Sequence, residues 1–194
     1  GVDPIVTSAQ IIMGLQTIVS RQMELTKEPV VISVGKITGG VRSNIIPEEV
    51  KMVGTIRTLD TAMQRIVHEK IRNTAVNIAE SMGATVDITI DKGYPVTYND
   101  LELTRKMLPT IFEAAGGEQN VILMKPSTGA EDFSFFAREI PGLFIFLGGM
   151  KPGTNTAEAP PHHTPDFRVE DDAMPLGIKT MCYLALDYMD AARR

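Results

Sequence analysis

The stretch Val50-Lys51-Met52-Val53-Gly54-Thr55-Ile56-Arg57 is predicted to be a β-strand that organises the first half of the chain. Residues 30–40 before it, in which apolar side chains alternate up to a pair of glycines, predict an earlier strand. The connection Arg42-Ser43-Asn44-Ile45-Ile46-Pro47 is long for a plain hairpin and apolar for an exposed turn. We therefore expect this connection to pack against another surface.

Helical patterns flank the two predicted strands. Asp3 and Pro4 fit the N-cap and the first position of a helix over residues 4–23. Thr61 and Gln64 match a capping box, which predicts a second helix that ends at Met82. The apolar stripe expected on the first helix is Ile5, Ala9, Ile12, Gln16 and Val19, and the stripe on the second is Met63, Ile66, Val67, Ile71, Ile78 and Met82.

Apolar alternation over residues 86–90 predicts a third strand, so the order of elements is α-β-β-α-β. One preceding strand would complete the ferredoxin-like βαββαβ arrangement, in which two helices cover one face of an antiparallel sheet. The first half is therefore predicted to be a ferredoxin-like domain that lacks its first strand.

The second half alternates helices with short apolar runs. Asn99 and Glu102 are expected to cap a helix that follows a linker over residues 93–100. Strands are predicted at residues 121–124 and 143–147, a short helix at 131–139, and a final helix from near Asp171. The final helix is expected to turn Ala173, Leu176, Met181, Leu184, Ala185 and Tyr188 inward. This alternation predicts part of a larger α/β sandwich.

Composition excludes several classes of function. The formal charge of −5 argues against a nucleic-acid partner, and the predicted strands carry Val, Ile and Met rather than the exposed aromatics of an RNA-binding split βαβ domain. No apolar run approaches the roughly 20 residues of a membrane span. The single cysteine, Cys182, excludes an internal disulfide and is expected to be a small buried side chain rather than a nucleophile. With no visible targeting signal, a cytoplasmic location is expected.

Two histidines, His162 and His163, stand in the proline-rich stretch Pro161-His162-His163-Thr164-Pro165-Asp166-Phe167. Neutral imidazole is a common ligand of zinc-like metals, and adjacent side chains point in different directions, so at most one of the pair is expected to be a ligand. A catalytic metal needs about three protein ligands, and the rest of the chain supplies no obvious set. The alternative is a solvated loop with two histidines of no function.

Two other segments are candidates for chemistry. In Ser127-Thr128-Gly129-Ala130-Glu131-Asp132-Phe133, small residues precede an acidic helix start, and the acidic pair also has a plain explanation as a stabiliser of a helix N-terminus. Asn44 in the turn and Arg57 on the next strand could converge on a carboxylate, whose oxygens the guanidinium fork matches. The alternative is a turn asparagine and a surface arginine.

Five segments in order resemble the M20 metallopeptidase and amidohydrolase family, in the branch of hippurate hydrolases, auxin-conjugate amidohydrolases and N-acyl-amino-acid amidohydrolases. The resemblance runs along essentially the whole chain. The segments are Gly1-Val2-Asp3-Pro4-Ile5, Gly39-Gly40 through Pro47, Gly54-Thr55-Ile56-Arg57-Thr58, Gly129-Ala130-Glu131-Asp132-Phe133 and His163-Thr164-Pro165-Asp166-Phe167.

The resemblance implies a lid and dimerisation domain at residues 1–95 and the C-terminal segment of an α/β catalytic domain at 96–194. It implies that His163 is a metal ligand, that Asn44 and Arg57 approach the substrate carboxylate, and that Glu131 lies close to the active site. The cofactor would be two divalent ions, zinc first, with Mn, Co or Ni as alternatives.

The family's N-terminal segments, which supply most metal ligands and the glutamate general base, have no counterpart here. The expected activity, hydrolysis of the amide bond of N-acyl amino acids or small peptides by a homodimer, therefore belongs to a longer enzyme of which this is the C-terminal portion. The alternative is that the chain alone is a non-catalytic dimerisation fragment without a complete metal site.

Overall fold

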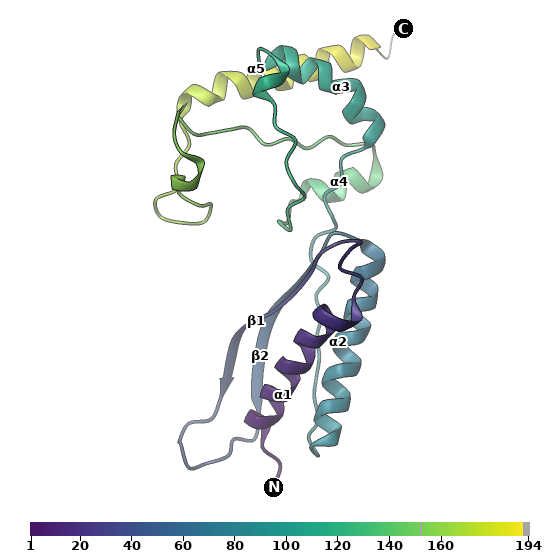
Figure 1. Ribbon diagram of the computed structural model, residues 1–194, viewed down its shortest axis with the longest axis vertical. Helices are drawn as coiled ribbons and strands as arrows, with labels where there is room; N and C mark the ends of the chain where they lie inside the picture. The colour runs from purple at the N-terminus through teal and green to yellow at the C-terminus, as the bar shows by residue number, and fades with distance from the viewer. Residues whose placement is uncertain (152, 192–194) are drawn as a thin grey trace. The chain divides into compact units, whose positions relative to one another are not determined.

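The computed structural model describes residues 1–151 and 153–191, which form two compact units. The first unit comprises Gly1–Val96 together with Pro126–Glu131. The second comprises the described part of Thr97–Lys125 and Asp132–Arg194. The short segment Pro126–Glu131 was not expected in the first unit, because the sequence on both sides of it belongs to the second. In Figure 1 the colour runs from purple at the N-terminus to yellow at the C-terminus, so each segment can be found by its residue number.

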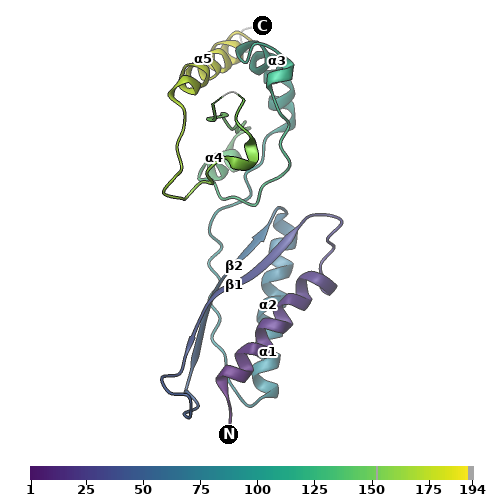
Figure 2. The ribbon, with the colours of Figure 1, turned by 60° about the vertical axis from the view of Figure 1, so that its left-hand side comes forward.

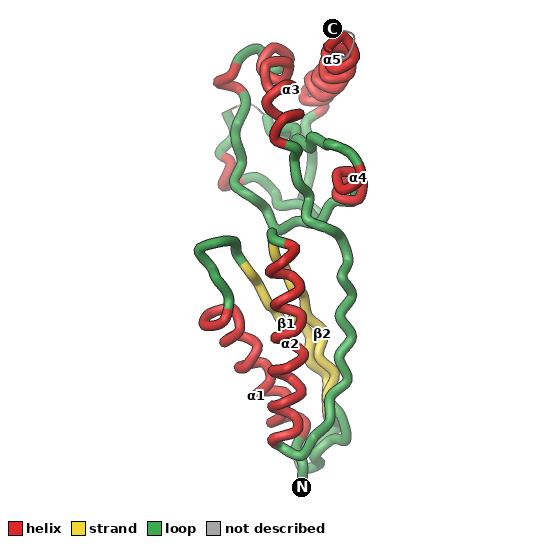
Figure 3. The backbone as a smooth tube through the Cα atoms, turned by 90° about the vertical axis from the view of Figure 1, so that its right-hand side faces the viewer, coloured by secondary structure: helices red, strands yellow, loops and turns green. Residues whose placement is uncertain are grey.

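The first unit is built on one hairpin. β1 (Val30–Gly39) and β2 (Val50–Thr58) pair antiparallel, with a bulge between Val34 and Lys36. Both predicted strands are confirmed. Two helices, α1 (Pro4–Thr17) and α2 (Thr61–Ser81), lie side by side on one face of this hairpin (Figures 2 and 3). A π-helical turn, Ile18–Gln22, continues α1.

The helix starts follow from capping chemistry. The carboxylate of Asp3 accepts hydrogen bonds from the backbone N–H groups of Ile5 and Val6, which confirms the predicted start of α1. The cap of α2 is Asp60 rather than the predicted Thr61, because the Asp60 carboxylate accepts from the N–H of Met63 at 2.7 Å. The predicted capping box at Thr61 is therefore wrong by one residue.

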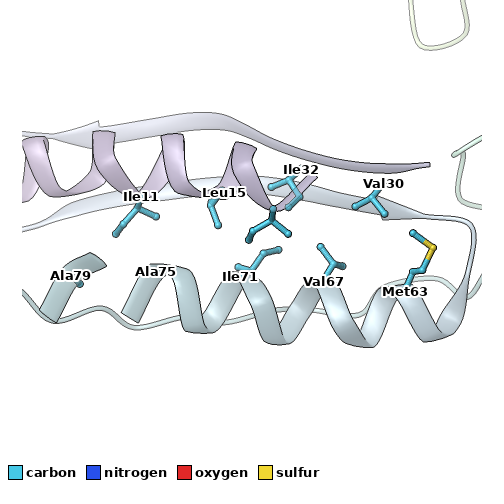
Figure 4. Close-up of a cluster of buried hydrophobic side chains, with 10 residues drawn as sticks. Ile11, Leu15, Val30, Ile32, Met63, Val67, Ile71, Ala75 and Ala79 are labelled. Atoms are coloured by element: carbon cyan, nitrogen blue, oxygen red, sulfur yellow. The ribbon is translucent and has the colours of Figure 1, made fainter. Parts of the chain in front are cut away.

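The hydrophobic core of this unit lies between the two helices and the hairpin (Figure 4). Ile18 and Val67 are fully buried, and the core also contains Ile11, Leu15, Val30, Ile32, Met63, Ile71, Ala75 and Ala79. The stripe predicted for α1 is wrong, since Ile5 is 47% exposed and the buried stripe is Ile11, Leu15 and Ile18. The buried face of α1 also includes Thr7 and Ser8, while Gln16 is exposed and its amide donates to the Ile32 carbonyl at 3.4 Å.

The predicted strand at residues 86–90 is not formed as a strand. Val86, Ile88 and Ile90 do alternate toward the core, as the sequence pattern requires. Among the described residues, however, no neighbouring strand lies in hydrogen-bonding register with this segment, and Ile88 instead accepts from the guanidinium of Arg72 at 2.8 Å. Extended backbone becomes a strand only by pairing, so within the described residues this segment is extended but unpaired, and the sheet contains β1 and β2 alone.

The second unit is held by two helices. α3 (Leu101–Ala114) packs against α5 (Met174–Ala191), and the hydroxyl of Thr110 donates to the Asp187 carboxylate at 2.6 Å between them. The short helix α4 (Phe133–Glu139) and 3-10 turns at Glu118–Asn120, Thr156–Glu158 and Asp171–Ala173 complete the regular structure among the described residues.

Several expectations for α5 are wrong. Met181 is 64% exposed, Tyr188 is 50% exposed and Leu176 is 38% exposed, although all three were expected to face inward. Cys182, expected to be buried, is also exposed. In the described part of the chain only α3 makes an extensive helix contact with α5, so most of the apolar stripe on α5 is left uncovered.

The predicted strands at 121–124 and 143–147 are not formed either. The main chain of Phe144, in the second of these segments, is hydrogen-bonded to the side chain of Asn99 instead of to a strand. The Asn99 amide nitrogen donates to the Phe144 carbonyl at 2.9 Å, and its amide oxygen accepts from the Phe144 N–H at 2.7 Å. This pairing also corrects the predicted cap of α3, which is Asp100 rather than Asn99. The result is a mixed α/β fold whose described sheet has two strands. No described helix is both long and apolar enough to cross a membrane.

Candidate functional site

Asn44 lies in the loop that joins β1 to β2. This loop and the start of α1 line an open depression of ≈ 550 Å³, to which Asp3, Gly40, Asn44 and Pro47 contribute. The loop was expected to pack against another surface, but Val41 is 94% exposed, and Ile45 and Ile46 are more than half exposed. Within this chain the loop therefore presents both an amide and apolar side chains to the outside.

Arg57 lies at the opposite end of the same hairpin. It pairs with Val31, whereas the Asn44 loop starts after Gly39, so about 25 Å of strand separates the two ends at roughly 3.3 Å per residue. The structure therefore does not bring Asn44 and Arg57 together within one chain. The convergence on one carboxylate that the sequence suggested cannot occur between residues of a single hairpin.

The exposed guanidinium of Arg57 instead contacts the segment Pro126–Glu131. Its Nη1 donates a hydrogen bond to the carbonyl oxygen of Thr128 at 3.0 Å, across 71 residues of sequence. Glu131, the candidate catalytic residue, ends this segment and so belongs to the same unit as Arg57. Sequence reasoning missed Thr128 because a backbone carbonyl carries no residue-type signal.

His163 belongs to the second unit and has an unusual backbone. Its φ of 64° lies in the left-handed region, which is uncommon for a residue with a Cβ atom. The hydroxyl of Thr164 donates to the carbonyl of Pro161 at 2.8 Å and thereby holds the turn that contains both histidines. The rings of His162 and Phe167 make an edge-to-face contact, with 4.7 Å between their centroids. His162 therefore packs on an aromatic side chain. The His163 side chain is exposed.

The residues described here do not supply a complete metal site. Across residues 1–151 and 153–191, no group of three or more His, Cys, Asp or Glu side chains is arranged to hold a metal ion. A catalytic metal takes about three protein ligands. His163 alone does not fit that requirement, so a metal held by His163 would need further ligands from outside the described residues.

Two titratable side chains with shifted pKa values lie in α2 and at its start. The backbone N–H of Met63 and the ammonium of Lys27, 3.1 Å away, hold the pKa of Asp60 below its ordinary value. Burial, with Lys92 and Arg72 nearby, lowers the pKa of His68. Hydrogen bonding at a helix cap and burial in a helix account for both shifts, and neither marks a further catalytic group.

Comparison with known proteins gives the chain its family. The model of peptidase family M20/M25/M40 matches residues 6–187. A thermostable carboxypeptidase of Saccharolobus solfataricus is 32% identical over 96% of this chain and 46% of its own length. An IAA-amino acid hydrolase of Arabidopsis thaliana is 32% identical over 97% of this chain and 43% of its own.

A solved structure agrees. The crystal structure of a dinuclear metal-binding peptidase of the M20 family from Bacillus subtilis has a TM-score of 0.74 and 28% identity, covering 97% of this chain and 47% of that one. The chain thus spans about half the length of the relatives it matches. Because the family match extends over most of its residues, the chain belongs to peptidase family M20/M25/M40.

Proposed function

We propose that this chain is part of a metal-dependent amidohydrolase that cleaves the amide bond of N-acyl amino acids or small peptides. The observation that carries the proposal is the family match over residues 6–187, together with relatives whose names are those of a carboxypeptidase and an amino-acid-conjugate hydrolase. Both of those activities release an amino acid with a free carboxylate. A carboxylate-bearing substrate is therefore the class that this proposal assigns.

Arg57 is the residue that we assign to the substrate carboxylate. Its guanidinium is exposed at the end of β2 and hydrogen-bonded to a neutral acceptor, the Thr128 carbonyl. Guanidinium pairs with carboxylate through two parallel hydrogen bonds, which fixes orientation as well as supplying binding energy. Holding the carboxylate would position the amide for hydrolysis, and positioning of this kind can lower the barrier by several kcal/mol.

Asn44 is assigned to the same carboxylate, and its position has a consequence for the assembly. Because Asn44 and Arg57 lie at opposite ends of one hairpin, they can reach one ligand only if two copies of the chain contribute one residue each. A symmetric dimer creates two such composite sites, since every contact occurs twice. This supports a homodimer formed through the first unit, in which the exposed apolar loop around Asn44 approaches the partner.

His163 is proposed as a ligand of a divalent metal, with zinc as the first candidate and Mn, Co or Ni as alternatives. The name of the Bacillus subtilis structure attributes two bound metals to that relative. Since the described residues hold no complete ligand set, most ligands and the general base would come from the rest of a longer enzyme. The 194-residue chain alone is accordingly proposed to be inactive, with Glu131 as the candidate active-site residue that it contributes.

The test compares two polypeptides with one set of substrates. The 194-residue chain and the longer natural polypeptide that contains it would be assayed with N-benzoylglycine, N-acetylated amino acids and dipeptides, with and without added Zn²⁺ or Mn²⁺. The expected result is metal-dependent release of free amino acid by the longer polypeptide alone. Failure of the longer, metal-loaded polypeptide to cleave any of them would overturn the proposed activity, and cleavage by the short chain would overturn its assignment as an inactive part.

A further inference from the structure

The Arg57 side chain is held at both ends. At its base, Arg57 is paired with Val31 in the β1–β2 ladder. At its tip, Nη1 donates a hydrogen bond to the carbonyl oxygen of Thr128 at 3.0 Å. An arginine side chain has many rotamers, and an exposed one samples them unless its tip is bonded. The two attachments therefore limit the directions in which the guanidinium of Arg57 points.

The hydrogen bond to Thr128 uses only part of the guanidinium. A guanidinium has five N–H donors, and Nη1 carries two of them. The parallel N–H groups of Nε and Nη2 lie on a different edge from the N–H groups of Nη1, and they form a fork that matches the two oxygens of a carboxylate. Among the described residues, the structure gives Arg57 no second hydrogen bond and no carboxylate partner. Because Arg57 is also exposed, its Nε–Nη2 edge is open to a ligand.

We propose that the Thr128 carbonyl is a positioning group, which orients Arg57 so that the Nε–Nη2 edge receives the substrate carboxylate while Nη1 stays bonded to Thr128. This inference rests on the proposed function of Arg57 and goes beyond it by assigning the edge that recognises the substrate. Carbonyl and carboxylate bind at the same time, to different N–H groups. Because the carbonyl holds the side chain before the substrate arrives, binding costs less side-chain freedom, which raises the affinity for carboxylate substrates.

The direction of one kinetic change separates this arrangement from its alternatives. If the Thr128 carbonyl orients Arg57, weakening that carbonyl as an acceptor raises KM for a carboxylate substrate and leaves kcat unchanged. If the carbonyl competes with the carboxylate for the same N–H groups, weakening it lowers KM. If the hydrogen bond serves only to place Glu131 at the end of the segment, weakening it lowers kcat and leaves KM unchanged.

The carbonyl is weakened by turning the amide between Thr128 and Gly129 into an ester, with glycolic acid incorporated at position 129 of the longer, metal-loaded enzyme. An ester carbonyl is a weaker acceptor than an amide carbonyl, and no side chain changes. The substrate is the N-acyl amino acid that this enzyme cleaves fastest. Its KM is expected to rise roughly threefold, which is part of the value of one ordinary hydrogen bond, with kcat unchanged.

Two controls isolate the carbonyl. The ester also removes the N–H of Gly129, which donates to the hydroxyl of Ser127 at 3.3 Å. Ser127→Ala removes the same hydrogen bond and keeps the amide, so the rise in KM with the ester is expected to exceed any rise in Ser127→Ala. In an Arg57→Gln background the ester is expected to cause no further rise, because the group that the carbonyl orients is gone.

The remaining outcomes count against the inference in distinguishable ways. A fall in KM, an unchanged KM, a rise no larger than that of Ser127→Ala, or a rise that persists in the Arg57→Gln background would overturn the orienting role. In each of these cases the carboxylate role of Arg57 stands, provided that Arg57→Gln alone raises KM. If Arg57→Gln alone leaves KM unchanged, the carboxylate role fails, and the inference fails with it.

Discussion

Asn44 and Arg57 are held at opposite ends of the β1–β2 hairpin, with the length of the strand ladder between them. A single chain therefore cannot use both on one ligand, which is the geometric reason for proposing that two chains share each carboxylate site. A site shared between two chains and a site within one chain predict different activities for dimers that combine two variants.

We expect Asn44→Ala and Arg57→Ala each to lower kcat/KM of the longer enzyme for N-acyl amino acids by about tenfold or more, as for loss of a hydrogen bond to a charged group. Mixed dimers of the two variants should regain activity, because one of their two sites combines an intact Asn44 with an intact Arg57. Random mixing of equal amounts gives about one quarter of the unaltered activity. The measurement is kcat/KM after the two variants are refolded or expressed together.

The matched control for these mixed dimers is the unaltered enzyme combined with the double variant. If each site is shared between the chains, every hybrid dimer of that pair has two damaged sites. If each site lies within one chain, every hybrid dimer keeps one intact site. Unaltered homodimers alone supply about one quarter of the activity of that mixture, and one good site per hybrid dimer raises it to about one half. About one half with the double variant, together with no recovery with the two single variants, would exclude the composite arrangement.

Ile18 gives the second prediction, on stability. It is 0% exposed in the core between α1, α2 and the hairpin. Ile18→Ala removes three buried carbon atoms and leaves a cavity, so we expect a loss of about 3 kcal/mol in the free energy of unfolding. Met13→Ala on the same segment is the control, because Met13 is 66% exposed and should change stability by less than about 0.5 kcal/mol. Urea unfolding followed by circular dichroism measures both, and equal effects would contradict the assigned helix face.

Asn99 gives a third prediction, for the second unit. Its side-chain amide satisfies both main-chain groups of Phe144, one at 2.9 Å and one at 2.7 Å. Asn99→Ala leaves both unpaired and is expected to cost about 2 kcal/mol, the sum of two ordinary hydrogen bonds. The control is Asn120→Ala, which removes a single exposed bond to the Ala115 carbonyl. Hydrogen exchange of the Phe144 amide should accelerate in Asn99→Ala alone; protection that persists there would argue against this pairing.

Elements whose stabilising partners lie within the chain could be predicted from the sequence. The strands Val30–Gly39 and Val50–Thr58 were predicted well because each is the other's pairing partner within the chain. The starts of α1, α2 and α3 were placed within about a residue, since caps such as Asp3 act on backbone groups close in sequence. Local patterns were sufficient wherever the stabilising contact is local.

The same patterns failed where the partner is not in the described chain. Residues 86–90, 121–124 and 143–147 alternate or are continuously apolar as strands are, yet none pairs with a neighbouring strand among the described residues. Ile122 and Leu123 are accordingly 82% and 98% exposed. The candidate site was only partly predictable for a related reason: residue types marked Arg57, but neither its separation from Asn44 nor its bond to a backbone carbonyl has a sequence signature.

Asp60 gives a fourth prediction, on pH dependence. Its pKa is held below the ordinary 3.8 by the Met63 N–H and by Lys27. A carboxyl group whose folded pKa is depressed contributes stability above its unfolded pKa, and that contribution is lost as pH falls through the folded value. We therefore expect the melting temperature to decrease as the pH drops below about 4. The decrease should be smaller in Asp60→Asn, because asparagine keeps a capping oxygen but does not titrate. Identical profiles from pH 7 to pH 2.5 would show that Asp60 contributes nothing to the acid sensitivity.

His163 gives the last prediction, because its backbone conformation favours glycine whereas its proposed role as a metal ligand requires an imidazole. At a φ of 64° a Cβ atom is unfavourable, so His163→Gly should leave the 194-residue chain as stable as before or more stable by about 1 kcal/mol, whereas His163→Ala gains nothing.

The proposed metal-binding role of the His163 side chain is tested in the longer enzyme. Metal analysis should find less bound metal in both His163→Gly and His163→Ala. His162→Ala, which removes the ring packed on Phe167, should keep the metal. Equal metal loss in the His162 and His163 variants would contradict the assignment of His163 as the ligand of the pair. Destabilisation by His163→Gly would instead show that the imidazole supports the loop itself.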